Sequence, residues 1–321
     1  MARVLVTRPL TEGGTDPLLD AGHEIVLPEG GSPLRPEELV RLAGECDGIV
    51  CHLTDRIDAA VFESGRNGTL RVVANAAVGY DNIDVVSANA LGITVCNTPG
   101  VLDDTTADLA FLLILTATRL ASDAERDLRE GRWTGWGFGT NLARDVHGAT
   151  LGLVGFGRIA RAVARRAEGF SMEVIHTTRH DTGEPGFVPT LDELLERSDI
   201  VSLHVPLSEA TRHLIGAPQL ARMKTTAVLI NTARGPVVDE DALVDALESG
   251  SLYAAGLDVF DGEPKVNPRL LSAPRTTLLP HIGSATIATR TRMARLACQG
   301  VCDVLAGRTP PNAVVPTPQP A

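Results

Sequence analysis

The chain of 321 residues is too long for one ordinary hydrophobic core, so its length indicates two domains. A formal net charge of -11 argues against nucleic acid as the main partner, because phosphate binding needs a basic surface. With 44% hydrophobic residues but only 3% aromatics, the composition favours parallel sheets covered by helices over aromatic-rich β sandwiches.

The sequence gives no sign of a membrane anchor, a secretory signal or a metal site. The longest apolar stretch, residues 109–118, is too short to span a bilayer, and the N-terminus lacks the apolar core of a signal peptide. The five cysteines form no CxxC pair. Cys298 and Cys302, four apart on a predicted helix, are interpreted as ordinary thiols in a reducing compartment rather than as metal ligands. We expect a cytoplasmic protein without membrane association.

Short β-rich runs alternate with helical patterns along the chain, which indicates βαβ units and parallel sheets. The first set of predicted strands covers residues 3–7, 24–27, 48–51, 71–74 and 93–95. A long helical pattern follows at 103–130, with Asp104 or Thr105 as a possible cap, and then a loop at 131–139. The second set of strands covers residues 150–154, 173–177, 200–204, 227–231, 253–257 and 276–279.

Helices fit between most of these strands, for example at 58–64, 158–168, 191–197 and 240–248. The last helix is expected at about 284–305, and it belongs to neither set of strands in an obvious way. The ending, residues 309–321, contains five prolines and is interpreted as an extended or loose tail. The sequence therefore predicts an α/β protein with two doubly wound parallel-sheet domains.

A glycine motif of the form GxGxxA follows the first strand of the second set. Gly155 permits the tight turn, Gly157 lets the backbone approach a pyrophosphate, and Ala160 lets the helix pack closely on the strand. The helix that starts at Arg158 and Ile159 offers amide donors and a partial positive charge to the phosphates. Because the motif stands between an apolar strand and an amphipathic helix, it predicts a dinucleotide-binding domain.

The end of the next strand indicates which dinucleotide is bound. An NAD-specific site places Asp or Glu there to bind the adenosine ribose, but here no acid occurs before Asp181. A neutral Thr178 followed by Arg179 suits a 2′-phosphate, because a guanidinium pairs with phosphate and a carboxylate would repel it. We therefore expect NADP in preference to NAD. The alternative is that Arg179 is only a solvated charge at a strand end.

Three further apolar segments each lead into a chemically useful side chain: Arg234, Glu263 and His281. Ligands bind at the carboxyl ends of strands in open parallel sheets, so the three could assemble one site. Arginine can bind a substrate carboxylate and polarise its carbonyl, and histidine can donate or accept the proton that accompanies hydride transfer. A carboxylate bonded to that histidine would favour its charged form. Taken singly, each residue is more often solvated or structural, so the combination carries the prediction.

The sequence resembles the D-isomer-specific 2-hydroxyacid dehydrogenase family and, within it, the glyoxylate/hydroxypyruvate reductases. The matching stretches occur in the family's order, and they are VGYDNID at 78–84, NTPG at 97–100, DTTAD at 104–108, GFGRI at 155–159, VPL at 205–207, NTARG at 231–235 and PHIGS at 280–284. The resemblance implies that Arg234, Glu263 and His281 are the catalytic trio, with His281 as general acid and base.

The resemblance also implies a role for further residues. Backbone amides around Val78 and Gly79 would receive the substrate carboxylate, on a loop facing Arg234. Leu53 and Trp136, with Trp133 nearby, lie in segments that shape the substrate pocket in similar reductases. Positions that match the family's cofactor contacts are Thr106, Pro206, Ala233, Asp258 and Gly283.

The family's fold implies a flavodoxin-like substrate domain made of residues 1–99 and 286–321, a Rossmann cofactor domain at 100–285, and a cleft between them. Family members are usually dimers, so a homodimer is expected. The expected activity is reduction of a small 2-oxo acid, similar to glyoxylate or hydroxypyruvate, to the D-2-hydroxy acid with NADPH. Two alternatives remain open: a dehydrogenase for another 2-hydroxy acid such as 3-phosphoglycerate, and a non-catalytic, nicotinamide-sensing protein similar to corepressors of this fold.

Overall fold

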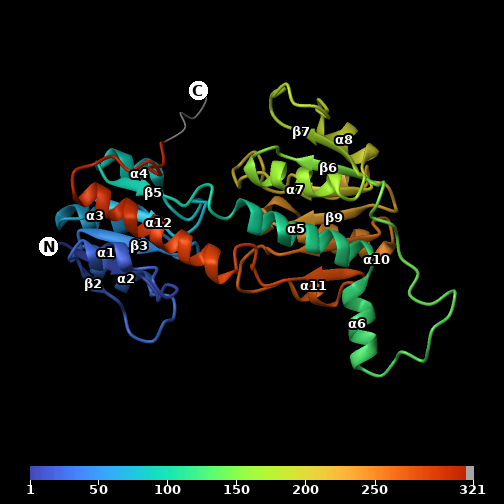
Figure 1. The fold of residues 1–321 in the computed structure, drawn as a ribbon, viewed down its shortest axis with the longest axis horizontal. Coiled ribbons are helices and arrows are strands. Elements are labelled where there is room, and N and C mark those ends of the chain that lie inside the picture. The colour runs from blue at the N-terminus through green and yellow to red at the C-terminus, as the bar shows by residue number, and fades with distance from the viewer. Residues whose placement is uncertain (316–321) are drawn as a thin grey trace. The chain divides into compact units, whose positions relative to one another are not determined.

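The structure is a computed structural model that describes residues 1–315. The chain divides into two compact units. The split unit comprises Met1–Leu102 together with the chain from Ser284 onward, and the continuous unit is Asp103–Gly283. Each unit is a parallel sheet with helices on both faces, which confirms the predicted α/β class and the two parallel-sheet domains (Figure 1).

The sheet of the split unit has the strand order β2-β1-β3-β4-β5, and every neighbouring pair is parallel. This is the flavodoxin-like order, in which the chain reverses direction across the sheet beside β1. One face is covered by α2, α3 and α4, and the other by α1 and α12. The bounds are β1 Arg3–Val6, α1 Asp16–Asp20, β2 Glu24–Val26, α2 Pro36–Ala43, β3 Gly48–Cys51, α3 Ala59–Asn67, β4 Val72–Asn75, α4 Val85–Ala90, β5 Thr94–Cys96 and α12 Ile287–Leu305.

The last helix of the chain packs against elements from its beginning (Figure 1). It begins at Ile287 rather than at residue 284, because the side chain of Thr286 accepts a hydrogen bond from the amide of Thr289 and caps it. The chain then returns along β5, where the amide of Val314 donates to the carbonyl of Val95 at 2.7 Å. Of the two alternatives for the ending, extended or loose, the chain as far as Val314 agrees with the extended one and is held along β5 rather than loose; residues 316–321 lie outside the described residues.

The sheet of the continuous unit has the order β11-β10-β9-β8-β6-β7, again with all pairs parallel. Beyond β7, a single parallel bridge between His176 and Phe187 occupies the place of a further Rossmann strand. Helices α5 and α7 cover one face, and α8 to α11 cover the other. The bounds are β6 Thr150–Val154, α7 Arg158–Glu168, β7 Glu173–Thr177, α8 Leu191–Arg197, β8 Ile200–Leu203, α9 Ala217–Leu220, β9 Val228–Asn231, the 3₁₀ turn Gly235–Val237, α10 Glu240–Ser249, β10 Ala254–Leu257, α11 Pro268–Ser272 and β11 Thr276–Leu278.

The single long helix expected at 103–130 is two helices, α5 (Asp103–Thr118) and α6 (Ala121–Arg129), joined at a bend of 68°. Leu120 ends the first helix in a left-handed conformation, with a φ of 50°. Half of the residues of α5 are buried in the core, whereas no residue of α6 is buried. The two helices therefore differ in what they pack against: α5 lies against the sheet and α6 lies at the surface. Because α5 begins at Asp103, the expected caps Asp104 and Thr105 lie inside its first turn.

No single helix within residues 1–315 has the length and apolarity to cross a bilayer. The bent pair α5 and α6 meets the criteria together, by length and composition only.

Candidate active site

The glycine motif of the continuous unit forms the turn between β6 and α7. Gly155 has a φ of +88°, and a Cβ atom there would lie 2.8 Å from the carbonyl oxygen of His204, so this position accepts only glycine. Gly157 is the N-cap of α7, and a Cβ atom built on it would meet nothing within 4 Å. The first amides of α7, at Arg158 and Ile159, therefore follow a residue that borders open space, and a helix N-terminus of this kind is suited to binding a phosphate.

A column of stacked side chains fixes the motif to β7. The ring of Phe156, the middle residue of the motif, stacks on His176 with centroids 3.8 Å apart and an interplanar angle of 9°. The guanidinium of Arg161 lies 4.8 Å from the centroid of the Phe156 ring. Burial lowers the pKa of His176, which keeps its ring neutral at neutral pH. The residue at the centre of the turn, Phe156, therefore packs against the uncharged ring of His176 on β7.

The end of β7 presents a neutral residue followed by a cation. Thr178 follows the strand, and its hydroxyl donates to the carbonyl of His180 at 2.5 Å. Arg179 is exposed. The next acid, Asp181, accepts a hydrogen bond from the amide of Gly183 at 2.8 Å in a local turn.

His281 and Glu263 form a hydrogen-bonded pair, with Nδ1 of the ring 2.7 Å from Oε2 of the carboxylate. The other carboxylate oxygen accepts the amide of Phe260 at 2.9 Å. Burial alone would raise the pKa of Glu263, but the hydrogen bonds from His281 and Phe260 and the nearby charge of Arg234 outweigh it and lower that pKa. His281 has a left-handed φ of 53°, which is unusual for a side chain of its size and common at functional sites.

Arg234 lies on the loop after β9, and this loop packs directly against the one that leads to Glu263. Asn231, at the end of β9, donates from Nδ2 to the carbonyl of Arg234 at 2.9 Å and accepts the amide of Ala233 at 3.0 Å. A Cβ atom on Gly235 would overlap the carbonyl carbon of Phe260 at 1.9 Å. Without a side chain at residue 235, the two backbones approach closely enough for Arg234 to act electrostatically on Glu263.

Asp258 holds the chain immediately after His281. Its two carboxylate oxygens accept the amides of Ile282 and Gly283, each at 2.8 Å. A Cβ atom on Gly283 would lie 3.4 Å from the side chain of Thr106, so three expected cofactor contacts meet at one point. Burial raises the pKa of Asp258 to about 6, against the lowering effect of the two amides and of the charge on His281.

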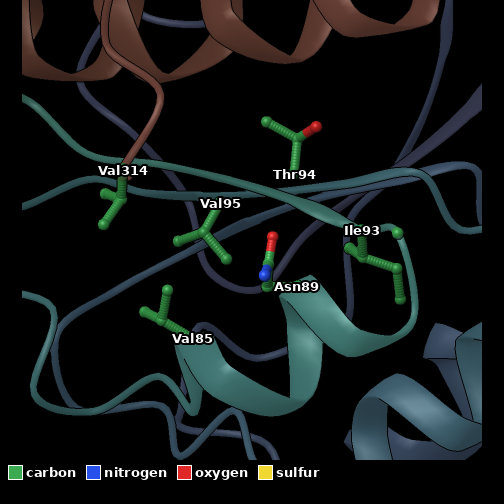
Figure 2. A pocket seen from close by; sticks show the side chains of 7 residues that line it. Val85, Asn89, Ile93, Thr94, Val95 and Val314 are labelled. Carbon is green, nitrogen blue, oxygen red and sulfur yellow. The ribbon is translucent and has the colours of Figure 1, made fainter. Parts of the chain in front are cut away.

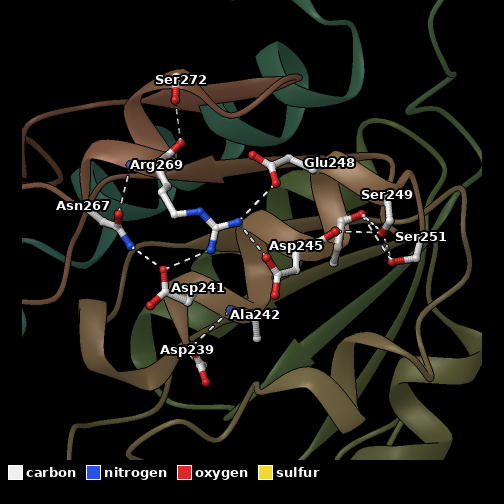
Figure 3. Close-up of polar contacts among 11 residues, drawn as sticks. Asp239, Asp241, Ala242, Asp245, Glu248, Ser249, Ser251, Asn267, Arg269 and Ser272 are labelled. Atoms are coloured by element: carbon white, nitrogen blue, oxygen red, sulfur yellow. Dashed lines mark hydrogen bonds and ion pairs between the residues drawn. The ribbon is translucent and has the colours of Figure 1, made fainter.

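The segment that carries Glu263 is anchored at both ends. Before Glu263, the buried carboxylate of Glu240 accepts the amide of Asp261 at 2.7 Å. After it, Figure 3 shows Arg269 of α11 pointing at three acidic side chains of α10, with distances of 3.4 Å to Asp241, 2.7 Å to Asp245 and 3.1 Å to Glu248. These contacts fasten the loop to the body of the continuous unit.

The remaining residues that the sequence predicted for the site are exposed or partly exposed. Pro206 is exposed after β8, with its carbonyl 2.6 Å from the hydroxyl of Thr211. Trp136 is 79% exposed and its ring lies near Phe138, with centroids 5.1 Å apart. In the split unit, Leu53 follows β3, and Val78 and Gly79 follow β4; all three are partly exposed at the carboxyl edge of that sheet.

Several polar residues that organise these loops were not predicted. Asn231 and Glu240 do so in the continuous unit, and Asn75 and Asn97 do so in the split unit. A shared signal was available, because Asn75, Asn97 and Asn231 each stand where an apolar strand ends.

Comparison with known proteins is consistent with this geometry. Residues 111–283 match the model of the family described as "D-isomer specific 2-hydroxyacid dehydrogenase, NAD binding domain". A glyoxylate reductase from Korarchaeum cryptofilum is 47% identical over 320 residues, which cover 97% of this chain and 95% of that protein. The chain belongs to the D-isomer-specific 2-hydroxyacid dehydrogenase family. It is therefore an oxidoreductase that uses a nicotinamide cofactor.

Solved structures of other proteins resemble this dehydrogenase over its whole length. The TT0316 protein from Thermus thermophilus has a TM-score of 0.92 at 43% identity, covering 98% of this chain and 100% of that one. An NADPH-dependent glyoxylate/hydroxypyruvate reductase from Sinorhizobium meliloti, in complex with NADP and malonate, has a TM-score of 0.85 at 35% identity, covering 97% and 96%.

Proposed function

We propose that the protein reduces glyoxylate, hydroxypyruvate or a similarly small 2-oxo acid to the D-2-hydroxy acid, with NADPH as the preferred cofactor. The observation that carries this proposal is the 2.7 Å hydrogen bond between His281 and Glu263, beside the loop of Arg234. Two of the relatives named above, the glyoxylate reductase from Korarchaeum cryptofilum and the glyoxylate/hydroxypyruvate reductase from Sinorhizobium meliloti, support the choice of substrate.

In this proposal His281 is the general acid and base. Bound NADPH would supply the hydride. Because Nδ1 is bonded to Glu263, the other ring nitrogen, Nε2, is the atom that gives a proton to the substrate carbonyl oxygen as negative charge develops there. The lowered pKa of Glu263 keeps its carboxylate ionised at neutral pH, and this charge stabilises the protonated ring. In the reverse direction, neutral His281 takes the proton back.

Arg234 would bind the substrate carboxylate and polarise the reacting carbonyl, since a guanidinium forms strong charge-assisted hydrogen bonds with both groups. The amides of Val78 and Gly79 would also receive the carboxylate. Leu53 and Trp136 would shape the pocket around the substrate's remaining atoms. These assignments divide the work between binding the acid group and moving the proton.

NADPH would be held by the turn at Gly155 and Gly157, with its 2′-phosphate beside Thr178 and Arg179 and its nicotinamide end near Asp258. The neutral Thr178 and the exposed Arg179 support this preference. The test is the ratio of kcat/KM values for NADPH and NADH. Arg179→Ala should lower kcat/KM for NADPH by about tenfold and leave that for NADH nearly unchanged. A wild-type preference for NADH would refute the proposal.

We also propose a homodimer joined through the continuous unit, in the cytoplasm. Large apolar side chains are exposed on α6 and the loop after it, which is unusual for a monomer, and they are Leu128, Trp133, Trp136, Phe138 and Leu142. The five free thiols of the described chain support a reducing compartment. Sedimentation should show a dimer, and Phe138→Ser should weaken it.

The decisive experiment is a panel of 2-oxo acids assayed with both reduced cofactors. It should show turnover of glyoxylate or hydroxypyruvate with NADPH, and His281→Ala should lower kcat by roughly 10²–10⁴. Preferential turnover of 3-phosphoglycerate would favour the other dehydrogenase, and cofactor binding without any turnover would favour a sensor. Near-normal turnover by His281→Ala across the neutral pH range would refute the assigned role.

A further inference from the structure

Three successive peptide groups after β4 have their carbonyl oxygens held by hydrogen bonds. The carbonyl of Ala77 accepts the amide of Thr98 at 3.0 Å. The carbonyl of Val78 accepts Nδ2 of Asn97 at 2.7 Å. The carbonyl of Gly79 accepts Nδ2 of Asn75, also at 2.7 Å. Two of these three anchors are asparagine side chains.

In a planar trans peptide the N–H points opposite to the C=O. Anchoring these three carbonyls therefore turns the amides of Val78, Gly79 and Tyr80 away from the groups that hold the carbonyls. No group among residues 1–315 accepts a hydrogen bond from any of these three amides. Successive amides that point to one side form a concave site with partial positive charge, which suits a carboxylate.

The anchors are themselves fixed. Asn75 is 0% exposed, and its Nδ2 also donates to Oδ1 of Asn82 at 3.0 Å. Asn82 in turn donates to the carbonyls of His52, at 3.2 Å, and Asp55, at 2.9 Å. The loop that carries Leu53 is thus tied to the same network. The carbonyl of Asn97 accepts the side chain of Asn312 at 2.8 Å.

We propose that Asn97 and Asn75 are positioning residues, which orient the amides of Val78, Gly79 and Tyr80 towards the substrate carboxylate without touching the substrate. This inference rests on the proposed function, because it concerns how that substrate is held. A subsite for the acid group holds the ground state and the transition state alike. Its loss therefore raises KM with little change in kcat.

The variant to test is Asn97→Ala, because Asn97 is partly exposed and its loss threatens the fold less than loss of the buried Asn75. Asn97→Leu, closer in volume and also without a donor, is the second variant. The matched control is Asn89→Ala. Figure 2 shows Asn89 on α4 at a separate pocket beside the start of β5, away from the ends of the strands that carry the network.

The measurements are KM and kcat for glyoxylate, and dissociation constants for NADPH and for oxamate, an unreactive carboxylate, on the NADPH complex. Asn97→Ala should raise the glyoxylate KM and the oxamate dissociation constant about tenfold, with kcat and NADPH affinity within about threefold of wild type. Asn97→Gln, which keeps an amide donor, should recover part of the loss. Asn89→Ala should match wild type.

A merely structural role would lower thermal stability, kcat and NADPH affinity together, and that result would overturn the inference. So would an unchanged oxamate affinity in a folded Asn97→Ala protein, and in that case glyoxylate turnover by the wild type would leave the proposed function intact. If the wild type neither reduces glyoxylate nor binds oxamate, both proposals fail. In the wild type, nuclear magnetic resonance should show the Gly79 amide signal shifting as oxamate is added.

Discussion

Replacing Glu263 by glutamine tests the link between the carboxylate and the proton donor. The side chains of His281 and Glu263 are 26% and 23% exposed, so their 2.7 Å contact is only partly screened by water. A charge-assisted hydrogen bond of this kind contributes about 1.5–3 kcal/mol, and about 1.36 kcal/mol corresponds to a tenfold change in rate. Glutamine keeps the shape and removes the charge that favours protonated His281.

Reduction of the 2-oxo acid requires His281 to donate a proton, and the negative charge of Glu263 favours the form of the ring that does so. Loss of about 1.5–3 kcal/mol of this support should lower kcat/KM for reduction by about 10- to 100-fold.

The assay is kcat/KM for glyoxylate at neutral pH with NADPH saturating. Glu209→Gln, a solvent-exposed change of the same chemistry in the continuous unit, is the control and should leave kcat/KM unchanged. A Glu263→Gln protein with the wild-type kcat/KM would show that Glu263 does not support the charged ring.

Three further predictions concern the continuous unit. Arg234→Ala should raise the KM for a 2-oxo acid about 10- to 100-fold with NADPH affinity nearly unchanged, and loss of NADPH binding would contradict its assignment. Burial raises the pKa of Asp258 to about 6 from 3.8, so stability from this group is present at low pH and lost as the pH rises through 6. Relative to Asp258→Asn, the wild-type free energy of unfolding should fall by about 3 kcal/mol between pH 3 and pH 7 in denaturant titrations; a constant difference would contradict this. Gly155→Ala should lower stability by about 1–3 kcal/mol and weaken NADPH binding, because the new methyl group meets a backbone carbonyl at 2.8 Å, and calorimetry measures both.

The strands were predictable because buried parallel strands are short apolar runs with polar ends. The runs at 48–51 and 150–154 match β3 and β6. The break at Leu120 was not predictable, because both flanking segments have helical composition and the bend depends on what each one packs against. The pairing of Val314 with β5 was also not predictable, because a proline-rich composition does not indicate which strand, more than two hundred residues earlier in the chain, the segment pairs with.

In the candidate site, too, some residues were predictable from the sequence and others were not. Glu263 and His281 were singled out from residue type and position after strands, and the structure brings their side chains into contact. Their role in proton transfer stays a prediction until the variants are assayed. Asn97 could have been noticed from its place at the end of an apolar strand, but the groups that Asn97 and Glu240 hold could not be predicted, because they are backbone carbonyls and amides whose directions are set only by the folded loops.

The return of the chain to β5 has a consequence for the order in which the protein matures on the ribosome. The continuous unit is a single uninterrupted segment and can close its sheet as soon as it has emerged, since domains generally fold as units during synthesis. The split unit is synthesised first but lacks α12 and the contact between Asn312 and Asn97 until the last residues are added. Until then one face of its sheet is covered by α1 alone, so the split unit is completed after the continuous unit.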